Sequence, residues 1–229
     1  RPPRWRIRPV KFDVSYTIDA LPRLFEGALV TLQVTLIGFF LSVTLATFLT
    51  VLRNARPSRL LEGGIGVFVS FIRGTPLLVQ IFLIYYVLPV AGVDIGPLTA
   101  GILAITLNSC AFVLEILRGG LASVPQGQIE AARALGLPTL ALWRKVILPQ
   151  VFITSIPPLV NEFTQVLKST PLLATITVVE LMRVSQQIFS RNYHPVEVLL
   201  GAFTLYFLMC FAVSRTSVLL ERRYELRRA

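Results

Sequence analysis

Long apolar segments constrain the fold of this chain more than any other feature of its sequence. Five of them follow one another, at residues 24–52, 60–90, 97–118, 149–180 and about 196–214. Beyond Glu26 near its start, the first is interrupted by uncharged polar side chains such as Thr31 and Ser42. A helical run of about 20 apolar residues matches the thickness of a bilayer's hydrocarbon core. The sequence therefore predicts an all-α integral membrane protein with about five transmembrane helices.

The composition supports one membrane domain. Hydrophobic residues make up 54% of the chain and charged residues 15%, whereas soluble domains contain about a quarter charged residues. The net charge of +10 does not indicate nucleic-acid binding, because the basic residues lie at the chain ends and in the loops. We therefore expect a basic, irregular or interfacial N-terminal arm at residues 1–23, a transmembrane domain at 24–220 and a basic cytoplasmic tail at 221–229.

Basic residues also predict which loops face the cytoplasm, since cytoplasmic loops carry an excess of Lys and Arg. The loop at residues 53–59, the stretch at 118–147 and the tail are all basic, and the 91–96 loop has no Lys or Arg. Five spans would then leave the basic N-terminal arm outside, against the rule. Either the rule has an exception here, or a further span precedes the sequence.

A polar, helix-prone stretch at residues 125–136 separates the third and fourth apolar runs. Glu130 lies early in this stretch, where an acidic side chain offsets the partial positive charge of a helix N-terminus. Gly136 is suited to end the helix in a left-handed turn, and Pro138 can open a second helix. We expect a helix, a turn and a second short helix exposed beside the membrane.

This stretch resembles the cytoplasmic loop of ABC importer permeases. In that family, Glu-Ala-Ala is followed by three residues of any type and then by Gly. Nine further residues lead to a β-branched apolar residue, which one residue of any type separates from Leu-Pro. The matching positions are Glu130, Ala131, Ala132, Gly136, Val146, Leu148 and Pro149. An ordinary surface helix can contain Glu-Ala-Ala, but the full spacing within a membrane chain is more specific. The resemblance implies the type I importer permease fold, with a cytoplasmic coupling helix in a loop at about residues 119–148.

Three further stretches resemble the branch that imports polar amino acids such as histidine, glutamine, glutamate, arginine or opines. They are Arg73–Gln80, Glu115–Gly120 and Leu167–Leu172. The last departs from the commoner Lys-Asp-Thr-Ser-Leu pattern at Ser169 and Pro171. The resemblance covers roughly residues 24–220.

The resemblance also implies partners and a location. Such a permease is a non-catalytic, multi-pass protein of the bacterial cytoplasmic (inner) membrane, in contact with lipid. It would work with a second permease subunit of the same or a homologous sequence, a dimer of ABC ATPase subunits that binds ATP and Mg, and an external or periplasmic substrate-binding protein. The chain has no phosphate-binding loop of its own. His194 has no partner at metal-ligand spacing, so we expect no metal site and no cofactor.

Polar residues within the apolar runs are the candidates for a substrate site, because an intramembrane carboxylate usually marks a substrate path or a buried pair. The candidate residues are Glu162, Asn161, Glu115, Gln165, Lys168, Thr75 and Gln80. For the polar side chains at residues 161–168, the alternative to substrate binding is interhelical hydrogen bonding. For Glu115, the alternative is an ion pair with Arg118. Residues 73–76 are either a structural break or part of the cavity lining.

The charges of these residues suit an amino acid. Glu162 and Glu115 offer partners for positive groups and Lys168 for a carboxylate, which favours a cationic amino acid. If Arg73 and Arg118 neutralise the glutamates, a neutral or acidic amino acid fits instead. Two other functions compete with an ATP-driven importer: a secondary transporter driven by an ion gradient, and a scaffold subunit that binds no substrate within a heterodimeric permease.

Overall fold

The computed structural model describes residues 12–55 and 58–225, and the secondary structure in these ranges is entirely helical. The α-helices are α1 (Val14–Ala55), α2 (Arg59–Gly74), α3 (Leu77–Phe82), α4 (Pro97–Ala122), α5 (Gln126–Ala134), α6 (Thr139–Leu142), α7 (Leu148–Ser169), α8 (Leu181–Asn192) and α9 (Pro195–Glu225). Short π-helical or 3₁₀ segments extend several of them, at Leu83–Val87, Pro89–Ala91, Trp143–Ile147 and Thr170–Ile176.

Several of these helices are long and apolar enough to cross a membrane. They are α1, α4, the continuous segment Thr139–Ile176 and the Pro195–Thr216 part of α9. Helix α2 and the segment Leu77–Ala91 form a further span if the two are counted together, although they are bent by 110° at the break between them. The expected all-α membrane fold with about five spans is confirmed.

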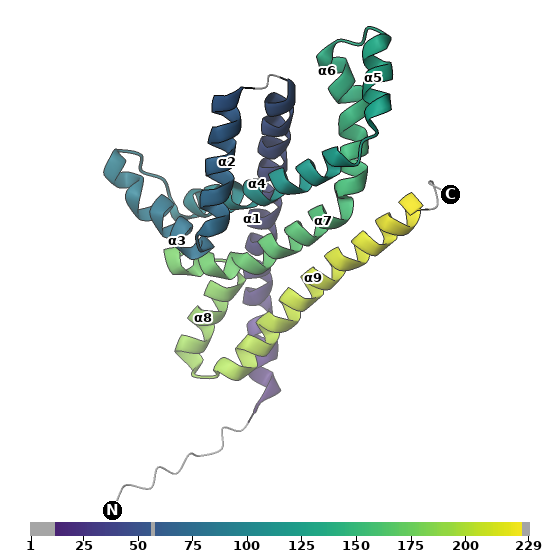
Figure 1. Ribbon diagram of the computed structural model, residues 1–229. Coiled ribbons are helices and arrows are strands. Elements are labelled where there is room, and N and C mark those ends of the chain that lie inside the picture. The colour runs from purple at the N-terminus through teal and green to yellow at the C-terminus, as the bar shows by residue number, and fades with distance from the viewer. Residues whose placement is uncertain (1–11, 56–57, 226–229) are drawn as a thin grey trace, which may run out of the picture.

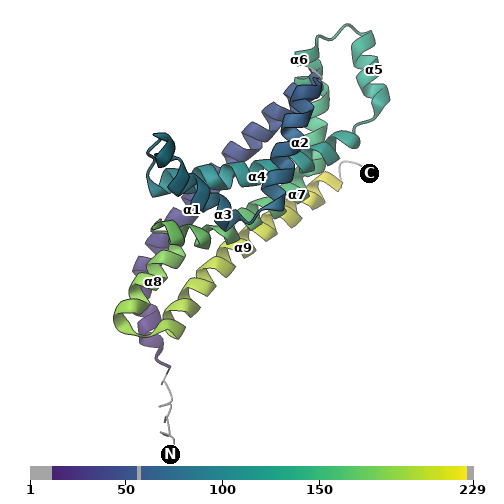
Figure 2. The same cartoon turned by 60° about the vertical axis from the view of Figure 1, so that its left-hand side comes forward.

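Helix α1 runs through the molecule and contributes to three successive hydrophobic clusters (Figures 1 and 2). Near its start it packs against α8 and α9, in its middle against α4 and the 3₁₀ segment Thr170–Ile176, and near its end against α4 and the start of α7. Small residues permit the close approaches. A Cβ on Gly27 would lie 2.8 Å from the Cα of Leu181 in α8, closer than side chains tolerate.

The two ends of the molecule differ. Helices α5 and α6 project at the end where α1 meets α2, and α8 lies at the opposite end beside the start of α1 (Figures 1 and 2). Two of the basic segments expected in the cytoplasm therefore share one end. We refer to the α5–α6 end as the inner end and the α8 end as the outer end. Large apolar side chains on α1 and α9 are exposed, including Phe40, Phe203 and Phe207, as suits contact with lipid or another membrane subunit.

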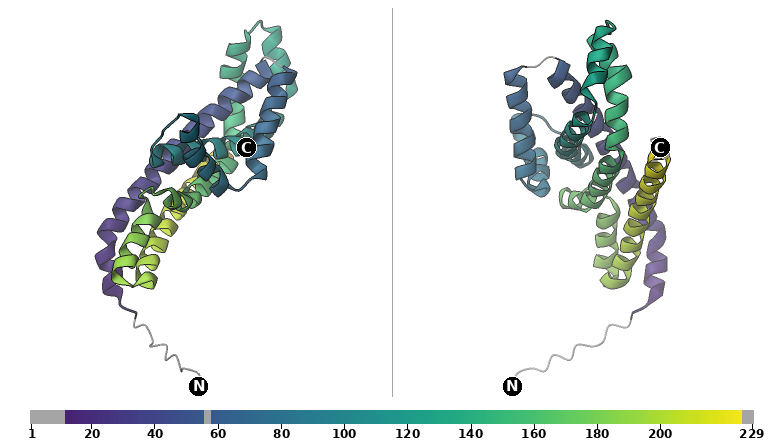
Figure 3. Two further views of the ribbon diagram at one scale, coloured as in Figure 1. Left: turned by 90° about the vertical axis from the view of Figure 1, so that its left-hand side faces the viewer. Right: turned by 45° about the vertical axis from the view of Figure 1, so that its right-hand side comes forward.

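Three boundaries differ from the sequence-based expectation. Helix α1 begins at Val14, so residues 14–23 are helical rather than irregular, while residues 1–11 of the expected arm lie outside the described residues. The fourth span is continuous with the helix that opens at Thr139. The polar connection expected from Arg183 to Pro195 is mostly helix α8, which lies beside α9 (Figure 3).

Helix α8 forms because its apolar side chains are covered and its N-terminus is capped. Leu181 and Val184 are buried against α1 and α9. The Glu180 carboxylate accepts hydrogen bonds from the backbone N–H groups of Met182 (2.9 Å) and Arg183 (2.8 Å) and from the Tyr206 hydroxyl (2.7 Å). Burial raises the pKa of Glu180, and these hydrogen bonds oppose that rise.

Candidate functional site

The break between α2 and α3 forms one wall of the candidate site. Pro76 has no N–H group, so it cannot continue the hydrogen bonding of α2. The Gln80 amide nitrogen donates to the backbone oxygens of Ile72 (2.8 Å) and Thr75 (3.1 Å), and the Asn108 amide donates to the Gln80 side-chain oxygen (2.9 Å). Backbone groups freed inside a membrane need such partners. Gln80, expected at the substrate, is buried and holds the break against α4.

A cavity of about 320 Å³ lies between this break, α4 and α7. Its lining residues are Ile72, Arg73, Thr75, Leu77, Ile105, Asn108, Phe112, Glu162, Gln165, Val166 and Ser169. We call it the Glu162 pocket. About half of these residues are apolar and the others are polar or charged, and the volume lies within the usual range for a small-molecule site.

The Glu162 pocket contains some of the residues expected from the sequence and not others. Glu162, Gln165 and Thr75 line it. Asn161 and Lys168 are exposed on α7 and do not line it. The pocket also includes Arg73, from the 73–76 stretch that the sequence offered as a structural break or cavity lining, and Asn108, Phe112 and Ser169, which the sequence analysis did not name as candidates. Asn108 and Phe112 come from α4 and Ser169 from α7, so no local spacing in the sequence could have grouped all three.

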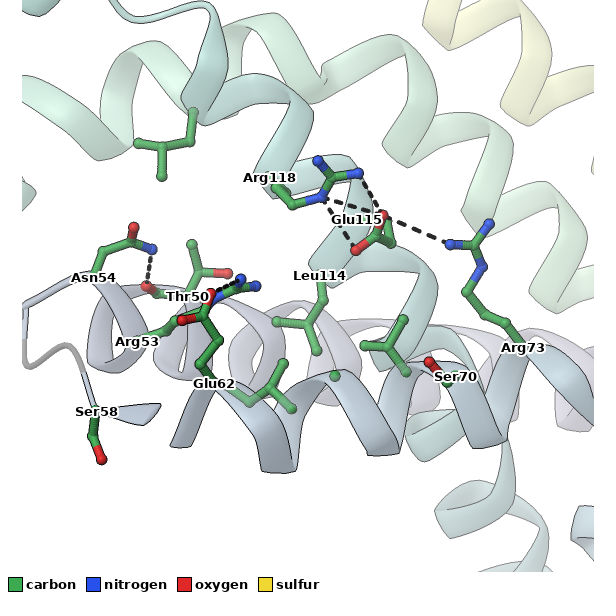
Figure 4. Close-up of a pocket in the computed structure, with 14 residues that line it drawn as sticks. Thr50, Arg53, Asn54, Ser58, Glu62, Ser70, Arg73, Leu114, Glu115 and Arg118 are labelled. Atoms are coloured by element: carbon green, nitrogen blue, oxygen red, sulfur yellow. Dashed lines mark hydrogen bonds and ion pairs between the residues drawn. The ribbon is translucent and has the colours of Figure 1, made fainter. Parts of the chain in front are cut away.

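Glu115 faces a second cavity, of about 700 Å³, between α1, α2 and α4 (Figure 4). We call it the inner vestibule. Arg118 donates to both carboxylate oxygens of Glu115, with a shortest distance of 2.7 Å, which confirms the expected pairing. Arg73 Nη1 lies 3.7 Å from Glu115 Oε2, and Arg53 pairs with Glu62 at 2.7 Å across α1 and α2. Glu115 therefore does not lie in the same cavity as Glu162.

The polar stretch between α4 and α7 has the expected helix–turn–helix structure. Helix α5 ends at Ala134, and Gly136 has φ of +74°, which confirms the expected left-handed turn. The Gly136 N–H donates to Arg133 O (2.9 Å) and the Leu137 N–H donates to Ala132 O (3.2 Å), as in a Schellman-type helix end. Helix α6 follows directly after Pro138.

The side chains of this loop divide into an inward and an outward set. Ala132 is buried in the hydrophobic cluster that the end of α1 forms with α2, α4 and the start of α7. Glu130 and Ala131 are exposed, and so are two large apolar side chains, Leu135 (80%) and Leu140 (76%). The sequence analysis did not single out these leucines. Exposed apolar side chains beside a small-residue surface favour protein contact.

Comparison with known proteins agrees with this architecture. Residues 38–226 match the family described as binding-protein-dependent transport system inner membrane components. The chain belongs to this family.

Relatives of this permease are known as transport subunits. The nopaline transport system permease protein NocM of Agrobacterium fabrum is 40% identical, over 91% of this chain and 90% of its own length. The L-cystine transport system permease protein TcyB of Bacillus subtilis is 38% identical, over 89% of this chain and 87% of its own. The glutamine transport system permease protein GlnP of Escherichia coli is 36% identical, over 95% of this chain and all of its own.

Solved structures lead to the same family. A chain in the crystal structure of an amino acid ABC transporter with histidines superimposes with a TM-score of 0.84 and 33% sequence identity, covering 93% of this permease and all of that chain. A chain of the methionine transporter MetNI in an inward-facing conformation has a TM-score of 0.63 at 21% identity, covering 89% of this permease and 97% of that chain. The second likeness concerns the fold alone.

Proposed function

We propose that this permease carries a polar amino acid through the Glu162 pocket and that ATP hydrolysis by a partner, not by this chain, drives the transport. The observation that carries the proposal is the pocket itself, in which Glu162 and Arg73 bring opposite charges into one cavity with both apolar and polar walls. An amino acid has a positive and a negative group, and both would find a partner there. The relatives' names, which refer to nopaline, L-cystine and glutamine, support an amino acid or a derivative of one.

Glu162 is the residue we assign to the positive group of the substrate. No ion pair involves Glu162 within the described part of the chain, whereas Glu115 is paired with Arg118 and approached by Arg73. An unpaired carboxylate in a low-dielectric cavity favours binding of an ammonium or guanidinium group. This asymmetry supports a substrate with an accessible positive group, and a cationic amino acid remains the favoured class.

We assign docking of the ATPase dimer to the exposed surface of α5 and α6. Glu130 and Ala131 lie on that surface, Gly136 fixes the turn, and Leu135 and Leu140 provide apolar contacts. The inner end would then face the cytoplasm, and an external binding protein would deliver substrate at the outer end. A second permease subunit, the same or homologous, would complete the assembly in the bacterial inner membrane.

Substitution of Gly136 tests the coupling. Valine is β-branched and strained at positive φ, whereas asparagine tolerates the left-handed conformation. In proteoliposomes containing the assembled transporter, we expect Gly136→Val to lose most ATP-driven uptake while the protein still reaches the membrane, and Gly136→Asn to keep it. Full uptake by Gly136→Val would refute the assigned role of the turn.

Two further measurements separate this function from the alternatives. A secondary transporter would purify without an ATPase and would respond to an ion gradient rather than to ATP. Co-purification of an ATPase subunit with this chain, and uptake that stops when ATP is removed, would exclude it. A scaffold subunit would leave uptake unchanged when Glu162 is replaced by glutamine, because its own pocket would hold no substrate.

A further inference from the structure

Arg73 lies between the Glu162 pocket and the inner vestibule. Its side chain lines both cavities, and it lies in the last turn of α2, which ends at Gly74 before the Thr75-Pro76 break. Figure 4 shows its guanidinium pointing toward Glu115 from the end of α2. About half of the side chain (49%) is exposed, so a solute in either cavity could reach it.

The contacts of Arg73 are weak compared with those of its neighbour Arg118. Arg73 Nη1 is 3.7 Å from Glu115 Oε2, and its guanidinium carbon is 5.7 Å from the Phe112 ring centroid. Its side chain donates no hydrogen bond to any residue that the structure describes, although a guanidinium has five N–H donors. Arg118, in contrast, donates three hydrogen bonds to Glu115. Glu115 would therefore keep its main partner if Arg73 turned away.

We propose that Arg73 turns away from Glu115 and binds the carboxylate of the transported amino acid, while Glu162 binds the positive group of the same substrate. This assignment rests on the proposed function of the Glu162 pocket and adds the requirement for a free carboxylate. A guanidinium can bind a carboxylate through two parallel hydrogen bonds, which are stronger in a partly desolvated site. Lys168, which the sequence suggested for this role, does not line the pocket.

The shared position of Arg73 also gives a route for release. Glu115 is a resident carboxylate on the vestibule side and competes with the substrate for the same guanidinium. When the substrate moves toward the vestibule, Arg73 can return to Glu115, so that its own charge keeps a partner after release. Binding at one cavity and release into the other would thus use a single arginine at the end of α2.

Equilibrium binding to the purified permease–ATPase complex tests this assignment. The external binding protein is left out, because it selects substrates itself. Tritiated L-arginine, L-glutamine and L-cystine are the probes, and the competitors are the free amino acid and its α-amide, which lacks the negative charge. The wild-type complex should bind the free amino acid about tenfold or more tightly than the α-amide, as expected for charged hydrogen bonds.

Two neutral variants and a matched control decide the outcome. Arg73→Gln, and Arg73→Met if the first fails to assemble, should bind acid and amide with nearly equal affinity, whereas Arg53→Gln on the vestibule wall should keep the wild-type preference. An unchanged preference for the acid in either neutral variant would overturn the assignment of Arg73. If the wild-type complex binds none of the three probes, the failure lies with the proposed function.

Discussion

Four glutamates of this permease form two contrasting pairs. Glu180 and Glu197, at the outer end, are 0% and 1% exposed. Glu115 and Glu162 each line a cavity large enough to admit a solute. The carboxylates buried most deeply are thus those that no solute reaches. Open space beside a carboxylate, rather than its depth, distinguishes a candidate transport residue.

The outer pair holds helices together. Glu180 caps α8 and accepts the Tyr206 hydroxyl of α9. One oxygen of Glu197 lies 3.2 Å from His194 Nδ1 and accepts the Asp13 backbone N–H at 3.3 Å, which joins the start of α9 to the start of α1. Its other oxygen has no hydrogen-bond partner among the described residues. These contacts are of the kind that stabilises a fold.

The largest expected effect belongs to the outer pair. Glu180→Ala would leave the Met182, Arg183 and Tyr206 donors without their acceptor in a buried environment, and it would remove the cap of α8. Each buried, unsatisfied donor costs roughly 1–3 kcal/mol, so we expect a loss of about 3 kcal/mol or more in the free energy of unfolding. Denaturation in detergent micelles measures it. Glu180→Gln keeps one acceptor oxygen and should recover part of the loss. A Glu180→Ala variant as stable as the wild type would contradict the structural role of Glu180.

The next largest effect concerns transport rather than stability. Glu162→Gln keeps the shape of the side chain and removes its charge. We expect uptake at low substrate concentration to fall about tenfold or more, as for the loss of a charged hydrogen bond, while assembly and basal ATP hydrolysis stay near wild type. Uptake assays and ATPase assays on the same proteoliposomes measure both. Unchanged uptake would place Glu162 with the structural pair.

The smallest effect should have the opposite sign. Glu115→Gln removes the competitor for Arg73 at the cost of a partly exposed ion pair, and such pairs contribute about 0–1 kcal/mol to stability. Substrate binding to the permease–ATPase complex should therefore strengthen by up to about fivefold, with little change in the unfolding midpoint. Weaker binding in this variant would show that Glu115 contacts the substrate itself.

The sequence predicted the helices of this fold better than the contacts between them. The spans followed from hydropathy, and the Gly136 turn followed from the conformational freedom of glycine. Helix α8 was missed because 12 residues are too few for a span and its surface is polar, although Leu181, Val184 and Ile188 recur at helical spacing. Glu180, directly before that pattern, could have been recognised as a helix cap.

The candidate pocket shows why the remainder could not be predicted. Glu162 and Glu115 were selected because they interrupt apolar runs, but their cavities depend on how α2, α4 and α7 cross. Lys168 looked like a carboxylate partner because of its positive charge beside the polar residues of the fourth span, and yet it does not line the pocket. Arg73 reaches the same pocket from α2, about 90 residues earlier in the chain. Such a contact is a product of tertiary packing, which a single sequence does not encode in any local pattern.

The most direct test is a structure of the assembled transporter, with its ATPase dimer and a transported amino acid bound. Our account predicts ligand density in the Glu162 pocket of this subunit, with the positive group of the substrate near Glu162 and its carboxylate near Arg73, and the ATPase seated on α5 and α6. An occupied site formed without Glu162 or Arg73, or an ATPase docked away from α5 and α6, would contradict it.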